Sequence, residues 1–175
     1  MAYSLFDASI PVYLHMLRNL AAILDKAEAH AKANGVDPQN YLDARLAPDM
    51  HPLINQVQLA SDAAKGGAAR LAGVTPPSFA DTETTWAEVK ARVAKTIAFV
   101  EGIQRGQLDG REDATIEIPL PNRTLTFSGR DFLALFSLPN FLFHVTTAYA
   151  LLRAKGVPLG KMDFLNGAQA VPVPA

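Results

Sequence analysis

The chain has 175 residues, of which 49% are hydrophobic and 19% charged, and its 16 basic and 17 acidic side chains give a net charge of −1. This is typical of a globular domain with a hydrophobic core. A balanced charge without a Lys/Arg run gives no reason to expect nucleic acid or an anionic membrane as partner. The absence of cysteine excludes disulfides, zinc thiolates and thiol nucleophiles. Together with an N-terminus that makes a poor signal peptide, it favours a cytoplasmic protein.

Apolar residues recur at helical spacing through the first half of the chain. Residues 4–35 are predicted to form a long helix that Gly35 ends. Asp37-Pro38 then starts a short helical turn, because Asp caps a helix and Pro suits its first position. Residues 50–73 form a second long helix, rich in Ala and Leu, that contains the pair Gly66-Gly67.

The second half begins with a capping box at Thr85–Glu88, which predicts a third helix over residues 86–106. The spacing of apolar residues then changes from a helical period to the period of two that is typical of strands. Residues 114–120 and 123–129 alternate apolar and polar side chains, so they predict a small β-hairpin.

A fourth helix is expected over residues 131–156, with Ser128 as its cap. Pro139 should break or kink it near Ser137. Its stretch 132–152 is apolar nearly all round but interrupted by polar residues, so it is interpreted as a buried helix and not as a membrane span.

The predicted fold is therefore all-α. One domain of residues 1–165 forms a bundle of four main helices, with a small β-hairpin inserted before the last one. Residues 166–175 are expected to be a mobile tail.

Candidate site residues form two polar stripes at helical spacing. The stripe on the second helix is spaced by four, three and four, and consists of His51, Asn55, Gln58 and Asp62. The stripe on the fourth helix is spaced by four and three, and consists of Asn140, His144 and Thr147. If the stripes face each other, His51 and His144 would supply nitrogen ligands, with Asn55 or Asp62 as an oxygen ligand or second-shell partner. The alternatives are a solvent-exposed face on the second helix and a hydrogen-bonded core histidine at position 144.

Other chemistry has weaker support. Arg45 lies between Asp43 and Asp49, and is interpreted as part of an ion-pair and capping cluster at the turn before the second helix. The alternative is that Arg45 binds an anionic substrate at the mouth of the bundle. No GxSxG elbow, Walker sequence, GxGxxG, HExxH or EF-hand loop is present.

Three stretches carry a resemblance to a known family: YLDARLAPDMHPLINQVQLASDAAKGGAARLAG, FSLPNFLFHVTTAYALLRAKG and VPLGKMDFL. The chain resembles a family of uncharacterised bacterial and fungal proteins grouped with the DinB-like (YfiT-like) helix-bundle superfamily, over residues 4–165. This resemblance implies a DinB-like four-helix bundle and a homodimer.

The resemblance also implies a metal site. Many members of the superfamily hold a divalent metal with three histidines, one from the second helix and an H-x-x-x-H pair from the last. Bacillithiol- or mycothiol-dependent thiol transferases and a maleylpyruvate isomerase are among them. His51 matches the first ligand and His144 the second member of the pair, whereas Asn140 stands where its first member is expected. The cofactor so implied is a divalent nickel, zinc, iron or manganese ion.

Two hypotheses follow from these residues. In the first, the protein is a metal-dependent or degenerate thiol-transferase-like enzyme with a site between the second and fourth helices. The residues that line this site are His51, Asn55, Asp62, Asn140, His144 and Tyr149. Without a metal, His144 could still act as a general base. In the second, the protein is a non-catalytic bundle that binds a small molecule or a partner helix. His144 is then structural, and satisfied by Tyr149, a backbone carbonyl or a water.

Overall fold

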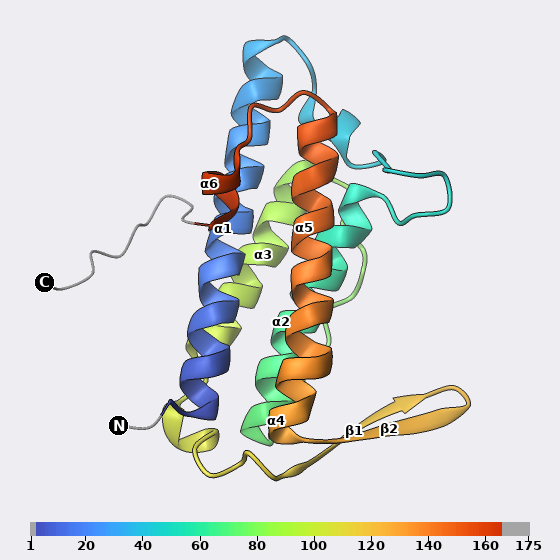
Figure 1. The fold of residues 1–175 in the computed structure, drawn as a ribbon. Helices are drawn as coiled ribbons and strands as arrows, with labels where there is room; N and C mark the ends of the chain where they lie inside the picture. Colours follow the sequence, from blue (N-terminus) through green and yellow to red (C-terminus); the bar gives the residue numbers. More distant parts are fainter. Residues whose placement is uncertain (1–2, 166–175) are drawn as a thin grey trace, which may run out of the picture.

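The computed structural model describes residues 3–165 and consists mainly of four long helices packed side by side (Figure 1). These helices are α1 (Leu5–Ala33), α2 (Leu53–Ala72), α3 (Trp86–Glu101) and α5 (Leu138–Ala154). The antiparallel strands β1 (Thr115–Leu120) and β2 (Arg123–Ser128) form a hairpin that projects from the end of the bundle where α5 begins. The predicted all-α bundle with an inserted hairpin is thus confirmed. The tail predicted at 166–175 lies outside the described residues.

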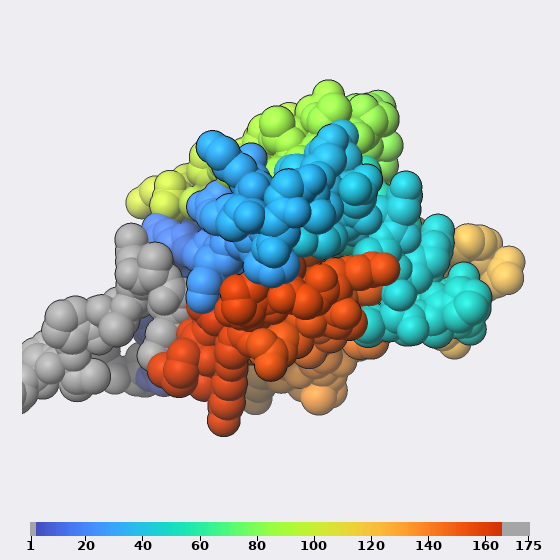
Figure 2. All heavy atoms as spheres, turned by 90° about the horizontal axis from the view of Figure 1, so that it is seen from above, coloured from blue at the N-terminus to red at the C-terminus, as the bar shows by residue number. Residues whose placement is uncertain are grey.

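Shorter helical elements connect or follow these helices, among them the 3-10 turn Arg105–Gln107. Pro38–Tyr41 is a single 3-10 turn, α4 (Gly129–Asp131) leads into the last long helix, and α6 (Lys161–Leu165) lies against α1. Seen along the bundle from the end where α5 finishes, the C-terminal part of α1 lies beside the segment that follows α5 (Figure 2).

Capping explains where the helices begin and end. Thr85 and Glu88 form the predicted capping box at the start of α3, with the Thr85 backbone N–H donating to the Glu88 carboxylate over 2.9 Å. Ser4 and Asp7 form a second capping box at the start of α1. Gly73 ends α2 in the left-handed conformation, with φ of 71°, where a residue with a Cβ would be strained.

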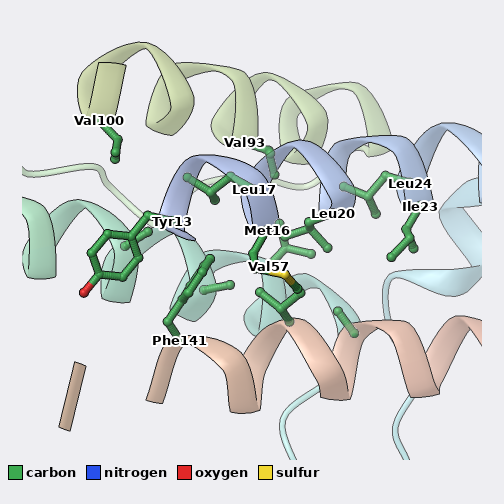
Figure 3. Close-up of a cluster of buried hydrophobic side chains, with 14 of the residues drawn as sticks. Tyr13, Met16, Leu17, Leu20, Ile23, Leu24, Val57, Val93, Val100 and Phe141 are labelled. Atoms are coloured by element: carbon green, nitrogen blue, oxygen red, sulfur yellow. The ribbon is translucent and has the colours of Figure 1, made fainter. Parts of the chain in front are cut away.

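The core lies where α1 faces α2 and α5. Leu17, Leu20 and Leu24 of α1 are fully buried and point into the space between the other helices, as Figure 3 shows. The ring of Tyr13 packs edge-on against Phe141 of α5, with centroids 5.3 Å apart. These contacts remove a large apolar area from water, which is the main driving force for folding.

Small residues let α2 approach α5 closely. Ala60, Ala64, Gly67 and Ala68 are all buried. The two helices run antiparallel, because Gln56 near the start of α2 contacts His144 in the middle of α5, while Gly67 lies beside Ser137 at the start of α5. This pair of helices has the most extensive packing in the bundle.

The last helix is not broken by Pro139. It continues from Gly129 to Ala154, and Phe132–Ser137 forms a π-helical stretch directly before the proline. Proline lacks an N–H and its ring clashes with the carbonyl four residues earlier. A widened turn accommodates both defects without ending the helix.

One face of this last helix is exposed, contrary to the expectation that it is buried all round. Leu135 is 71% exposed and Phe143 is 55% exposed. Among residues 3–165, Gly129–Ala154 is the one helix long and apolar enough to span a membrane by composition. Here it packs against α2 and α1.

The two adjacent glycines of α2 predict opposite mutational effects. A Cβ at Gly67 would overlap the hydroxyl oxygens of Ser137 and Tyr13, whereas a Cβ at Gly66 would meet only the mobile end of the Arg70 side chain. We expect Gly67→Ala to lower the free energy of unfolding by about 1–3 kcal/mol through overpacking. Gly66→Ala should leave it unchanged or raise it by up to about 1 kcal/mol, because Ala favours helix. Urea unfolding of both variants checks this, and equal effects would contradict the packing described.

Candidate functional site between α2 and α5

Gln56, which the polar stripes did not include, is the residue of α2 that reaches His144. Gln56 is 2% exposed, and its side-chain oxygen lies 2.8 Å from Nδ1 of His144. Its side-chain NH₂ group donates to the backbone carbonyl of His51 over 3.1 Å. The signal in the sequence was the row Gln56, Ala60, Gly67, which places the amide on the small-residue face that packs on α5.

This arrangement determines which nitrogen of His144 carries the proton. If the amide of Gln56 were reversed, its oxygen would face the carbonyl oxygen of His51 with no hydrogen between them. The oxygen therefore faces His144, and an amide oxygen only accepts hydrogen bonds. Nδ1 must carry the hydrogen and donate it to Gln56. Nε2 is left with a free lone pair, which can accept a proton or a hydrogen bond.

The imidazole of His144 is biased toward its neutral form. Burial lowers the pKa of His144 below its usual range because the charged ring loses solvation, and the neighbouring His51 lowers it further. His51 itself is exposed and lies two residues before the start of α2. The ring of Phe143 packs edge-on against His144, with centroids 5.2 Å apart.

Asn55, Gln58 and Asp62 share one face of α2, whereas His51 precedes the helix, and this face is joined mainly to α3 and to the loop before it. Asn55 donates to Gln58 over 2.7 Å, and Gln58 donates to Glu83 over 2.9 Å. Asp62 accepts from the buried guanidinium of Arg92 in α3, over 2.7 Å. Arg92 also pairs with Glu83 and Asp81, so the stripe ties α2 to α3 and to the loop before it.

The remaining predicted residues are dispersed. Thr147 is buried and its hydroxyl donates to the carbonyl of Phe143 over 2.7 Å, which satisfies it within α5. The ring of Tyr149 packs against Phe164 of α6, with centroids 5.9 Å apart, so it is not the partner of His144. Arg45 donates to the carbonyl of Met50.

The ion-pair cluster expected around Arg45 does not form. Within residues 3–165, neither Asp43 nor Asp49 lies within ion-pair distance of Arg45. The guanidinium instead satisfies a backbone carbonyl of the turn into α2.

The donor set does not fit the three-histidine metal centre. In the part of the chain that the structure describes, no three His, Cys, Asp or Glu side chains come together as metal ligands. Position 140 offers an exposed amide, a weaker ligand for first-row metals than imidazole. The Nδ1 atom of His144 is already bound by Gln56, so only Nε2 and the exposed ring of His51 remain.

A cavity of about 190 Å³ lies at the other end of the contact between α2 and α5. Two predicted residues, Asp62 and Asn140, come together in its lining. The other lining residues come from α2, β1 and the π-helical stretch: Leu59, Ala63, Gly67, Arg70, Ile118, Phe132, Phe136 and Ser137.

A buried polar pair lies behind this cavity. The hydroxyls of Ser137 and Tyr13 are 2.7 Å apart. Tyr13 is fully buried, and its burial raises the pKa of the phenol well above its ordinary value. Gly67 leaves the room that this pair needs beside α2.

Comparison with known proteins agrees with this architecture. The model of a family described as a domain of unknown function, DUF1993, matches residues 5–165. The chain belongs to the DUF1993 family. The crystal structure of a DinB family member from Shewanella denitrificans is similar to this DUF1993 protein, with 42% sequence identity and a TM-score of 0.86. The similarity covers 98% of this chain and 95% of that one. No curated protein matches the chain.

The lowered pKa of His144 predicts how stability depends on pH. Unfolded histidine titrates near pH 6.5, so below about that pH the unfolded chain binds a proton that folded His144 resists. The stabilising contribution of neutral His144 is therefore complete above about pH 6.5 and is lost as the pH falls. We expect the difference in free energy of unfolding between wild type and His144→Gln to shrink from about pH 8 to about pH 5. Chemical denaturation across this range checks it, and a difference that grows on acidification would contradict it.

Proposed function

We propose that this DUF1993 protein binds a small molecule at a metal-free site along the contact between α2 and α5, with His144 as its acceptor group. The observation that supports this most directly is the hydrogen-bond chain from His144 through Gln56 to the His51 carbonyl. The chain orients the ring and leaves Nε2 with its lone pair. Such orientation by a second residue is what a histidine acceptor or base requires.

The chemistry available to this group is proton acceptance. A ligand hydroxyl, thiol or amine that donates to Nε2 would become more nucleophilic as the proton moves to the ring. The imidazolium so formed would keep its Nδ1–H bond to the Gln56 oxygen, which becomes charge-assisted and stronger. A metal-free, thiol-transferase-like enzyme would need this step, because it has no metal ion to lower the pKa of the nucleophile. If no turnover follows, the same contact serves binding alone.

Asn140 lies between the imidazole of His144 and the cavity. Asn140 and His144 are four residues apart in α5, so they lie one helical turn from each other on the same face. Asn140 also lines the cavity, whose apolar and polar side chains are typical of a small-ligand site. A ligand held in the cavity would therefore be one turn of helix from the imidazole.

The proposal predicts that metal does not load this site. Elemental mass spectrometry on untagged protein should find no nickel, zinc, iron or manganese near one equivalent. Added Zn²⁺ should shift the melting temperature of wild type and of the His51→Ala, His144→Ala double variant alike. Near-stoichiometric metal that both single substitutions abolish would overturn the metal-free site.

For assembly, we propose a homodimer through the outer face of α5. Its uncharged residues follow a heptad-like spacing: Leu135, Pro139, Leu142, Thr146 and Ala150. None of these side chains is fully buried, and exposed Phe143 lies next to the row. Acidic Asp131 lies at one end of the row and basic Arg153 at the other. Two antiparallel copies would therefore bring opposite charges together at both ends.

This interface predicts separable effects on self-association. Phe143→Asp should abolish the dimer in sedimentation equilibrium without changing the circular dichroism, because the side chain is exposed. Asp131→Arg and Arg153→Asp should each weaken it, and the double variant should restore it. The control is Leu120→Asp on the hairpin, because Leu120 is exposed and lies outside the row. Phe136→Asp would not serve, because that ring packs in the aromatic cluster. A dimer unaffected by Phe143→Asp would contradict the interface.

The cytoplasmic location also remains part of this proposal. Its support is the cysteine-free composition, which needs no oxidising compartment.

A further inference from the structure

The cavity between α2 and the π-helical stretch has a free positive charge at its wall. Arg70 lines this cavity, and within residues 3–165 no carboxylate lies within ion-pair distance of its guanidinium. Its Nη1 donates to the carbonyl of Gly66 over 3.1 Å, one turn earlier in the same helix. The remaining N–H groups of the fork are available to a ligand.

The acidic residue in the same lining does not cancel this charge. Oδ1 of Asp62 lies 2.7 Å from Nη2 of Arg92 and 3.0 Å from Nζ of Lys65. Asp62 is thus held in an ion-pair cluster with Lys65 and Arg92, which also includes Asp81 and Glu83. Within the described residues no ion pair joins Arg70 to this cluster, so its guanidinium is the group of the lining that an anion would meet.

Part of the cavity lining is aromatic. Phe132 and Phe136 stack with their centroids 6.0 Å apart, and Phe127 of β2 packs on Phe136 at 5.6 Å. Ile118 of β1 and Leu59 of α2 extend the apolar lining. A ligand that is anionic at one end and apolar over the rest of its surface matches this lining.

Two further polar groups belong to the lining. The side chain of Asn140 is exposed in the first turn of α5, and the Ser137 hydroxyl is held by Tyr13. An amide and a hydroxyl beside a guanidinium can orient one planar group with two acceptor oxygens. The cavity volume of about 190 Å³ limits the ligand to a small molecule, below the range of drug-sized sites.

We propose that this cavity binds a small organic carboxylate, with its anionic group on Arg70 and its apolar body against Phe132 and Phe136. The proposal rests on the proposed function, because it assigns a ligand class to the cavity that Asn140 links to His144. A carboxylate suits the planar fork of Arg, which binds it through two parallel hydrogen bonds.

The test is a titration of the full chain with matched probes, followed by calorimetry and by NMR of the His144 ring. The probes are benzoate, phenylacetate and isovalerate, with benzamide as the neutral analogue of benzoate and inorganic phosphate as an anion without an apolar body. We expect at least one carboxylate to bind, and the matched neutral or inorganic probe to bind about tenfold more weakly or not at all. Arg70→Gln should weaken the carboxylate by about tenfold, and Arg70→Lys by less. Arg123→Gln, on the exposed hairpin, is the matched control and should change nothing.

Three outcomes would overturn the proposal: no binding by any carboxylate, equal binding of benzamide and benzoate, or equal binding to wild type and Arg70→Gln. The NMR readout separates this failure from failure of the proposed function. If a probe shifts the His144 ring resonances and binds wild type and Arg70→Gln equally, the site near His144 is supported and the carboxylate class is wrong. If a carboxylate depends on Arg70 but leaves His144 unchanged, the ligand class is right and the role of His144 is wrong.

Discussion

The close approach of α2 to α5 is the constraint on which the rest of the structure depends. Between Gln56 and Arg70, the side of α2 that meets α5 carries small residues, namely Ala60, Ala63 and Gly67. Helices that meet through such small residues bring their backbones close together. Larger side chains are then confined to the two ends of the contact, where Gln56 meets His144 and Tyr13 meets Ser137. These two places hold the polar groups of the contact between α2 and α5, whereas Arg92 gathers those between α2 and α3.

The two ends of the contact have complementary properties. At one end a buried amide holds an imidazole in a single tautomer, and at the other a π-helical stretch opens a cavity beside Arg70. Buried polar groups of this kind carry a desolvation cost, which their hydrogen bonds offset. The family resemblance led to the histidines, but the residue that orients His144 is a glutamine. With Asn140 in place of a third histidine, the site supports proton transfer and hydrogen bonding better than metal chemistry.

Local signals in the sequence predicted most of the fold. Capping residues, helical spacing and the strand-like alternation at 114–129 gave the four helices and the hairpin, because these patterns act over a few residues. The site was less predictable. Asn55, Gln58 and Asp62 share one face of α2, as their spacing requires, but spacing does not reveal which neighbour a face meets. This face meets α3 because the buried guanidinium of Arg92 forms ion pairs with Asp62, Asp81 and Glu83. The π-helical stretch depends on how the chain relaxes around Pro139, which no short pattern specifies.

The tautomer of His144 shows directly whether Gln56 orients its ring. Free neutral imidazole in a side chain favours a proton on Nε2, so a proton on Nδ1 requires the specific acceptor that Gln56 provides. Long-range proton–nitrogen correlation NMR, recorded above about pH 7 where the ring is neutral, assigns the two nitrogens without any ligand. We expect Nδ1 to carry the proton in the wild type, and Gln56→Leu to shift it toward Nε2. A wild-type ring protonated on Nε2 would contradict the proposed role of Gln56. The lone pair would then be on Nδ1, where it would face the glutamine and not a ligand.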